Sequence, residues 1–198
     1  MHPDPHFRWK DEAAVRDWVE QRGLAAIFVP GEGGPRVVHT PVTWHGEALR
    51  FHFSNRNIAM GEVDGRTALT VVSGPDHYIS PGWYDAGPDA VPTWNYVAVE
   101  IEGPVRAMGR EALTGQIDRL VEVHEGKLPE GRRWTRAKAD PAKIEKMLNE
   151  ITAYEQTVTA IRTTVKMNQN KSKAQRQRAA AALRTYGADA VADWMEGV

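Results

Sequence analysis

Residues 97–106 follow the two-residue repeat of an extended strand, and this repeat limits the possible folds more than any other feature of the chain. Four apolar residues alternate with smaller or charged ones: Val97, Val99, Ile101 and Val105 against Ala98, Glu100, Glu102 and Arg106. Because successive side chains of a strand point to opposite faces, one face is expected to be buried and the other exposed. The Gly103-Pro104 pair predicts a bend within this strand.

The same repeat occurs in residues 49–54, where Leu49, Phe51 and Phe53 stand between polar residues. Two further apolar runs, 24–29 and 37–44, flank a glycine-rich segment and are typical of a hairpin. Residues 67–73 and the threonine-rich residues 157–165 predict additional strands. The chain is therefore expected to contain six or seven strands.

Helices are expected at the start, middle and end of the chain. Asp11 is a plausible N-cap for a helix that Gly23 ends, and residues 113–121 are amphipathic. Asp140-Pro141 begins another helix, whose apolar face is expected to include Ile144, Met147, Leu148 and Ile151. A capping box at 172–175 and a weaker pattern at 188–195 predict two more. This order favours an α+β, mainly β fold, an antiparallel barrel with peripheral helices.

Composition excludes several classes of protein. The 25 Lys and Arg residues against 26 Asp and Glu give a net charge of −1, which argues against a wholly basic nucleic-acid-binding protein. The chain has no cysteine, so disulfides, thiolate metal sites and cysteine nucleophiles are excluded. The N-terminal residues lack the apolar run of a signal peptide, and the longest apolar run is too short to span a bilayer. We therefore expect a cytoplasmic protein without a membrane partner.

Aromatic residues concentrate in residues 78–99, in the segments Tyr-Ile-Ser-Pro-Gly-Trp-Tyr (78–84) and Val-Pro-Thr-Trp-Asn-Tyr-Val-Ala-Val (91–99). Rings, hydroxyls and an amide within so short a stretch are what a flat, partly polar ligand requires. The same rings would also fill a β-protein core or a dimer interface. The residues of this segment leave both interpretations open.

Several familiar sites have no support in the sequence. The glycines at 31–34 lead into a strand, and no lysine-serine pair follows them, so they do not form a phosphate loop. His39, His45 and His52 lack the spacing and the carboxylates of a metal-ligand motif, so no metal is expected. No serine lies in a nucleophile elbow, and no catalytic residue is assigned.

Residues 162–184 carry seven basic residues and no acidic one: Arg162, Lys166, Lys171, Lys173, Arg176, Arg178 and Arg184. Phosphate binding, to a nucleotide cofactor or to nucleic acid, is one interpretation, and a solvated helix face is the other. Lys166 differs from the rest because it stands between a predicted strand and the polar run 168–170. Donors from this junction would converge on a ligand.

With these segments placed, the chain resembles the PaiB family of FMN-binding negative transcriptional regulators. The resemblance rests on Phe7, Val38-His-Thr-Pro41, His52, the motifs 78–84 and 91–97, and Lys166-Met-Asn-Gln-Asn-Lys-Ser172. It implies the split β-barrel of flavin-reductase-like proteins, as a homodimer with FMN at the subunit interface. It also implies one such domain over residues 1–198, with a helical extension at 171–198.

The resemblance and the residue chemistry together assign FMN contacts. A flavin nucleotide needs donors for its phosphate, hydrogen-bonding groups at its pyrimidine edge and apolar walls for its ring. The phosphate group is expected to contact His39, Thr40, His52 and Arg56 or Asn57. The pyrimidine edge is expected to contact Thr93, Asn95, Gln169 and Asn170. The flavin ring, or the dimer interface, is expected to contact Trp83, Trp94 and Tyr96. The same motifs add Pro41 and Lys166.

One segment departs from the family pattern. The family tends to have His-x-Ala-Arg-Ala-Asn-Pro, whereas this chain has His52-Phe-Ser-Asn-Arg-Asn-Ile58. Asn55 thus occupies the usual arginine position, and Arg56 follows one residue later. A shift of one residue on an extended strand turns a side chain to the opposite face, which leaves the phosphate contact of Arg56 open.

Three functional classes are compatible with the sequence. The first is the FMN-binding regulator that the resemblance implies, acting on DNA directly or indirectly. No helix-turn-helix or zinc finger is present, so the basic helix after Ser172 is the only candidate for DNA contact. The second is an FMN-dependent NAD(P)H oxidoreductase, in which a nicotinamide binds transiently because no Rossmann fingerprint is present. The third is a haem-handling protein with a ligand such as His124.

Overall fold

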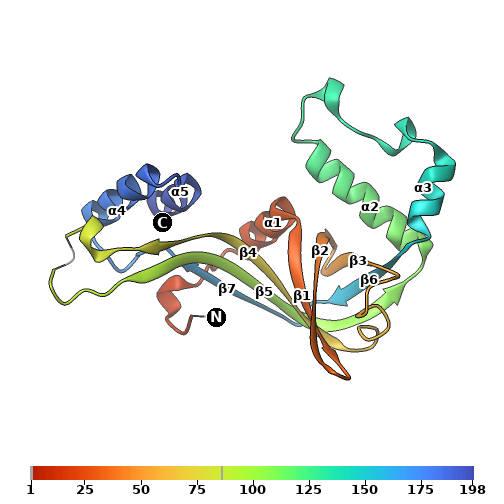
Figure 1. The fold of residues 1–198 in the computed structure, drawn as a ribbon, viewed down its shortest axis with the longest axis horizontal. Coiled ribbons are helices and arrows are strands. Elements are labelled where there is room, and N and C mark those ends of the chain that lie inside the picture. The colour runs from red at the N-terminus through yellow and green to blue at the C-terminus, as the bar shows by residue number, and fades with distance from the viewer. Residues whose placement is uncertain (1, 86) are drawn as a thin grey trace. The chain divides into compact units, whose positions relative to one another are not determined.

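The computed structural model describes residues 2–85 and 87–198, and this part of the chain contains seven strands and five α-helices (Figure 1). The strands are β1 (Leu24–Gly31), β2 (Gly34–His45), β3 (Ala48–Ser54), β4 (Thr67–Ile79), β5 (Thr93–Met108), β6 (Ile151–Thr157) and β7 (Ala160–Lys166). The helices are α1 (Glu12–Arg22), α2 (Arg110–Glu125), α3 (Pro141–Leu148), α4 (Lys173–Thr185) and α5 (Asp189–Gly197).

The strands pair in the order β4-β1-β2-β3-β6-β5-β7, and β4 also pairs with β5. The pairings of β1 with β2 and β4, of β3 with β2 and β6, and of β5 with β6 are antiparallel. The chain therefore has the expected fold, a split antiparallel barrel with peripheral helices.

The contacts divide the chain into two compact units. Unit 1 comprises residues 1–11, 73–99 and 162–198, and unit 2 comprises residues 12–72 and 100–161. The strands β4, β5 and β7 each contribute residues to both units.

The core of unit 2 forms around β3. Leu49, Phe51 and Phe53 are fully buried, and Arg50 and His52 between them are partly exposed, which confirms the predicted alternation. The ring of Tyr154 on β6 lies 5.9 Å from that of Phe51 and 5.1 Å from that of Phe53. This aromatic layer joins the two paired strands.

The placement of Ile151 in a helix was wrong, because α3 ends at Leu148 and Ile151 begins β6. Strand β6 has no apolar alternation, since four consecutive residues, 153–156, are buried. Two of them are polar and are satisfied inside the protein. Glu155 accepts hydrogen bonds from Arg50 (2.8 Å) and Arg106 (2.7 Å), and the amide of Gln156 bonds to residues of β4 and β5.

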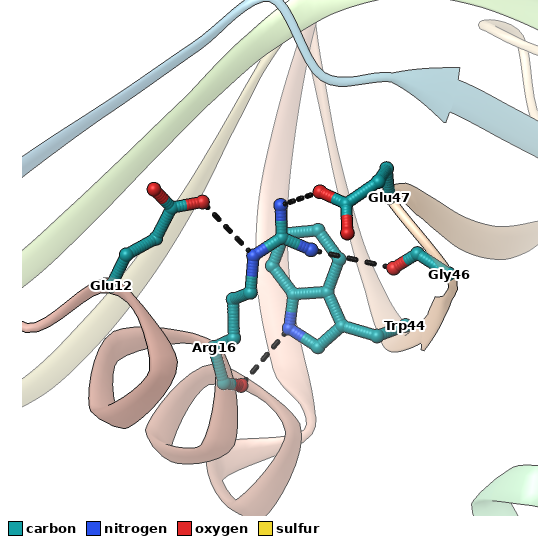
Figure 2. Close-up of polar contacts among 5 residues, drawn as sticks. All are labelled: Glu12, Arg16, Trp44, Gly46 and Glu47. Atoms are coloured by element: carbon teal, nitrogen blue, oxygen red, sulfur yellow. Dashed lines mark hydrogen bonds and ion pairs between the residues drawn. The ribbon is translucent and has the colours of Figure 1, made fainter.

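Helix α1 is attached to β2 and the following turn through Arg16 and Trp44. The indole Nε1–H of Trp44 donates to the carbonyl of Arg16 (2.9 Å), and the Arg16 guanidinium lies 4.4 Å above the indole ring (Figure 2). The guanidinium also bonds to Glu12, Glu47 and the carbonyl of Gly46 (Figure 2). Arg16 thus links α1 to β2 through its carbonyl and to the following turn through its guanidinium.

Three of the predicted helix ends are confirmed by their caps. Gly23 has a φ of +70° directly after α1, which suits glycine because this region costs other residues energy. The Asp140 side chain accepts from the Ala142 N–H at the start of α3. Ser172 and Gln175 make both bonds of a capping box at the start of α4.

In unit 1, α4 packs on α5 through buried residues of both helices, among them Ala179, Leu183, Val191 and Met195. The N-terminal segment is fixed to β7 by Thr163, whose hydroxyl accepts from the Trp9 N–H (2.9 Å) and donates to the Trp9 carbonyl (3.0 Å).

Candidate functional site

The expected FMN contacts fall in both units, and each set is described within its own unit. Six belong to unit 2: His39, Thr40, Pro41, His52, Arg56 and Asn57. Eight belong to unit 1: Trp83, Thr93, Trp94, Asn95, Tyr96, Lys166, Gln169 and Asn170.

The three expected contacts on β2 do not share one face. Thr40 is buried with its strand neighbours Val38 and Val42, whereas His39 is exposed and Pro41 is partly exposed. The Thr40 hydroxyl donates to the His52 carbonyl over 2.6 Å. Thr40 thus contributes to the pairing of β2 with β3, and the side chains of His39 and Pro41 point the other way.

The His52 ring is held by α2. Its Nδ1 lies 2.8 Å from Oε1 of Gln116, and because an amide oxygen only accepts, Nδ1 carries the proton. Burial lowers the pKa of His52, and the hydrogen bond to Gln116 offsets this only in part. The ring is neutral at pH 7, so it would meet a phosphate as a hydrogen-bonding group and not as a cation.

Asn55, which stands at the family's usual arginine position, lies in the turn after β3. Asn55 donates to the Asn149 carbonyl (2.9 Å) and accepts from the Thr152 hydroxyl (2.7 Å). Its amide therefore fixes the turn to the start of β6. The Arg56 side chain is 86% exposed and lies 3.4 Å from the Glu150 carboxylate, and the Asn57 side chain accepts from the Ala59 N–H (3.0 Å).

Three of the expected contacts in unit 1 meet in one cleft, which we call the Lys166 cleft. It has a volume of about 420 Å³. Thr93, Lys166 and Asn170 line it together with His2, Asp4, Phe7, Tyr84, Asp89, Ala90, Val91, Asn168 and Lys171. The Lys166 Nζ donates to the Thr93 hydroxyl over 2.5 Å, which leaves the ammonium group two further protons for a ligand.

The turn after β7 shapes this cleft. Asn168 has a φ of +58°, a conformation that asparagine tolerates better than most residues. The Gln169 amide closes the turn, since its oxygen accepts from the Met167 N–H (2.7 Å) and its nitrogen donates to the Val165 carbonyl (2.5 Å). Gln169 therefore supports the cleft through the backbone.

Asn168 lines the cleft but was not among the expected FMN contacts, although it belongs to the polar run 168–170. It is 4% exposed, and its buried Nδ2 has no hydrogen-bond partner in residues 2–85 and 87–198. An unpaired buried donor is costly, and it is typical of a position where a ligand or a water completes the structure. Its one sequence signal is an asparagine in a polar run directly after a strand.

Among the described residues, the carboxylates of the Lys166 cleft do not pair with its lysines, so the lysine side chains can bind a ligand. Asp4 is engaged with its own turn, because its carboxylate accepts from the His6 N–H (2.9 Å), and this bond, followed by the one to the His6 ring, lowers the pKa of Asp4. The side chains of Lys171 and Asp89 have no hydrogen bond or ion pair within the described ranges. The cleft thus presents donors from two lysines and two asparagines, with a single uncommitted carboxylate.

On β5 the expected contacts alternate between two faces. Asn95 is fully buried, and neither atom of its amide has a partner among the described residues. Trp94, on the opposite face, is 55% exposed and contacts Tyr78 edge to face at 6.5 Å. Tyr78 also meets Trp83, which stacks on Tyr186 at 5.3 Å. Trp83 and Trp94 therefore belong to one partly exposed aromatic cluster.

His124, the candidate haem ligand, lies in the last turn of α2. A Cβ added at Gly23 would come within 2.4 Å of its Nε2, and its Nδ1 lies 3.3 Å from the Lys127 Nζ. Within the described residues, no three His, Asp or Glu side chains gather where they would hold a metal ion. None of the helices in that part of the chain has both the length and the apolar character needed to cross a membrane.

Comparison with solved structures supports the fold. The FAD and heme binding protein of Mycobacterium smegmatis superposes with a TM-score of 0.59 at 15% identity, covering 85% of this chain and 78% of that one. The flavocytochrome Anf3 of Azotobacter vinelandii gives a TM-score of 0.62 at 16% identity, covering 83% of this chain and 72% of that one.

Comparison of sequences is more specific. "Protease synthase and sporulation protein PAI 2" of Bacillus subtilis (strain 168) is 24% identical over 178 residues, covering 87% of this chain and 84% of the relative. A family model described as "Putative FMN-binding domain" matches residues 1–160. The chain therefore belongs to this PaiB-type FMN-binding family.

Proposed function

We propose that this protein binds FMN and acts as a negative transcriptional regulator, as a cytoplasmic homodimer in which residues 1–198 form one flavin-binding domain extended by the helices after residue 171. Family membership supports the flavin, and the resemblance to the PaiB regulators supports the regulatory role. The observation that carries the flavin site is the Lys166 cleft, which is lined by Lys166 and by Asn168, an asparagine whose buried Nδ2 has no partner among the described residues.

The donors of the Lys166 cleft fit the carbonyl-rich pyrimidine edge of a flavin. Lys166 keeps two protons after its bond to Thr93, and Asn168, whose buried Nδ2 lacks a partner among the described residues, lines the same cleft. The amide of Asn170 supplies both a donor and an acceptor, which suits an edge that alternates carbonyl oxygens with a ring N–H. The expected contacts of unit 2, among them His39 and His52, remain predictions for the phosphate.

A bound flavin would supply one-electron and two-electron redox chemistry. The role of this chain is to bind and orient it. A lysine ammonium beside the carbonyl edge also stabilises negative charge there, so Lys166 would favour the reduced, anionic form of the ring.

A titration with FMN tests the site. Quenching of FMN fluorescence by the parent protein should saturate at micromolar concentration. Lys166→Met and Asn168→Gly should each weaken binding about tenfold, because each removes one hydrogen bond to the ligand. Glycine keeps the left-handed backbone of Asn168, and Lys146→Met on the exposed face of α3 is the matched control for charge. If the parent did not bind FMN, the proposal that the protein binds a flavin would be refuted. If both variants bound FMN as tightly as the parent, the Lys166 cleft would not be the FMN site.

If the protein regulates transcription by contacting DNA directly, the basic helix α4 is the candidate for that contact. Arg176 donates to the carbonyls of Lys171 and Val198 (both 3.0 Å), and Arg184 pairs with Asp193 and Glu196. Lys173 and Arg178 remain as exposed cations, with Asp85 3.7 Å from Arg178.

The test is binding of the parent and of the Lys173→Gln/Arg178→Gln double variant to promoter DNA across a range of salt concentrations. Direct contact predicts weaker binding and a flatter salt dependence in the variant. Equal binding would show that α4 does not contact the DNA. If the parent does not bind DNA at all and oxidises NAD(P)H steadily with FMN present, the oxidoreductase function takes the place of the regulator.

A further inference from the structure

A second cavity of unit 1 lies between the N-terminal segment and α5, and none of the expected FMN contacts except Gln169 lines it. It has a volume of about 650 Å³, within the range of small-molecule sites. Its most prominent walls are Trp9 and Trp194, whose rings meet edge to face at 5.2 Å with planes 79° apart. We call it the Trp9–Trp194 cavity.

Both aromatic walls are held in place before any ligand arrives. Trp9 is fixed to β7 by the two hydrogen bonds of Thr163, and Trp194 stands on α5 between residues that are buried against α4. Two indoles at right angles offer a face and an edge to the same guest, which is favourable for a planar aromatic ring. A preformed aromatic corner binds such a ring with little cost in conformational entropy.

The polar groups around the cavity determine the charge of the guest. The Asp193 carboxylate accepts from Arg184 over 2.8 Å, and both atoms of the Gln169 amide bond to the backbone. The side chains of Arg8 and Lys10 also line the cavity, and neither has a hydrogen bond or ion pair within residues 2–85 and 87–198. The uncommitted side chains with formal charge are thus two cations, one on each side of Trp9.

We propose that the Trp9–Trp194 cavity is a second ligand site, which takes a planar aromatic carboxylate. The ring lies in the indole corner, and Arg8 and Lys10 bind the carboxylate. The family match ends at residue 160, so Val165, Gln169 and Trp194 lie outside it. Arg8, Trp9 and Lys10 lie within it. None of the residues that line this cavity also lines the Lys166 cleft, so its ligand is separate from a flavin bound in that cleft.

Isothermal titration with 2-naphthoate tests the proposal, with neutral 2-naphthylmethanol and non-planar cyclohexanecarboxylate as comparisons. Naphthoate should bind, and both comparison compounds should bind about tenfold more weakly or worse, because each lacks either the charge or the planar ring. The Arg8→Gln/Lys10→Gln variant should weaken naphthoate binding about tenfold and leave naphthylmethanol unchanged. Lys173→Gln, a charge change in the same unit outside the cavity lining, should have little effect.

Nitrogen-15 spectra of the indole groups locate the bound ring. Naphthoate should shift the Nε1–H signals of Trp9 and Trp194, assigned through Trp→Phe variants, and Trp194→Leu should abolish binding while α5 stays folded. The same shifts should appear in the presence of saturating FMN. Competition between naphthoate and FMN, shifts confined to other tryptophans, or equal binding of all three compounds would each overturn the proposal.

Discussion

The Lys166 Nζ donates to the Thr93 hydroxyl over 2.5 Å, and this contact links the last residue of β7 to the first residue of β5. The two residues are 73 positions apart in the sequence, and each belongs to one of the motifs on which the family resemblance rests. The bond fixes a flexible ammonium group of a residue that lines the Lys166 cleft. Preorganisation of this kind reduces the entropic cost of binding a ligand.

Thr93→Val should therefore weaken FMN binding about fivefold without removing any charge from the Lys166 cleft. Valine has nearly the shape of threonine but cannot accept the lysine proton. Thr93→Ser keeps the hydroxyl and should bind FMN within about twofold of the parent. Fluorescence titration measures both, and equal affinities of the valine and serine variants would show that the Lys166–Thr93 bond does not position the lysine for FMN.

His52 should make stability depend on pH between neutrality and mild acid. Burial holds its pKa below the ordinary value of 6.5, so the unfolded chain binds the proton more readily than the folded one. This contribution to stability is fully present above pH 6.5 and is lost as the pH falls towards the folded-state pKa. Imidazole chemical shifts should titrate below pH 6.5 for His52. His52→Asn, which keeps a donor for Gln116, should reduce the slope of unfolding free energy against pH below 6.5.

The elements that the sequence predicted well are those in which a local pattern and the packing agree. Leu49, Phe51 and Phe53 alternate in the sequence and are buried in the structure, and the residues of the Ser172 capping box make both of its bonds. Strand β6 was missed because Glu155 and Gln156 look exposed in sequence. They can be buried because residues distant in the sequence, such as Arg50 and Thr70, form hydrogen bonds with their side chains. A local sequence pattern does not reveal such distant partners.

The arrangement of the candidate residues in space could be predicted only in part, for a similar reason. Thr93, Lys166 and Asn170 line one cleft, whereas Trp94, Asn95 and Gln169 of the same motifs do not. The expected FMN contacts on β2 were consecutive residues, although His39 and Thr40 point to opposite faces of the strand. The role of Asn168 depends on its positive φ and on a missing hydrogen-bond partner, and both are properties of the folded chain.

Trp44→Phe should lower the free energy of unfolding by about 1–2 kcal/mol. The change keeps an aromatic ring beneath the Arg16 guanidinium but removes the N–H that bonds to the Arg16 carbonyl at 2.9 Å (Figure 2). Trp134→Phe is the control, since this tryptophan is exposed and its indole N–H has no hydrogen bond within the described residues. Denaturant unfolding measures both, and equal losses for the two variants would contradict a specific role of the Trp44 N–H.

Glu155 should contribute stability that acid removes. Burial alone would raise its pKa, but hydrogen bonds from Arg106 and Arg50 outweigh this and hold the pKa of Glu155 below its ordinary value. A depressed folded-state pKa gives stability that is present above the unfolded value and lost as the pH falls through the folded one.

At pH 7, Glu155→Gln should cost about 2–3 kcal/mol because it replaces charge-assisted hydrogen bonds by neutral ones. The difference between parent and variant should shrink as the pH falls to about 3, below the ordinary pKa of a glutamate. Urea unfolding at several pH values measures this difference. A constant difference across the range would mean that the carboxylate charge is not what stabilises this position.

Gly103 is the position on β5 where a side chain should be least tolerated. A Cβ built there would lie 1.8 Å from the Thr157 carbonyl oxygen and 2.9 Å from its carbon, and backbone atoms cannot move aside as a flexible side chain can. Gly103→Ala should therefore cost about 3 kcal/mol or more, because it forces β5 away from the end of β6. Gly115→Ala in α2 is the matched control. It meets no atom within 4 Å, so it should stabilise the helix by about 0.5–1 kcal/mol. Thermal unfolding of the two variants should move in opposite directions, and a Gly103→Ala protein as stable as the parent would show that the close approach of β5 to Thr157 is not required by the fold.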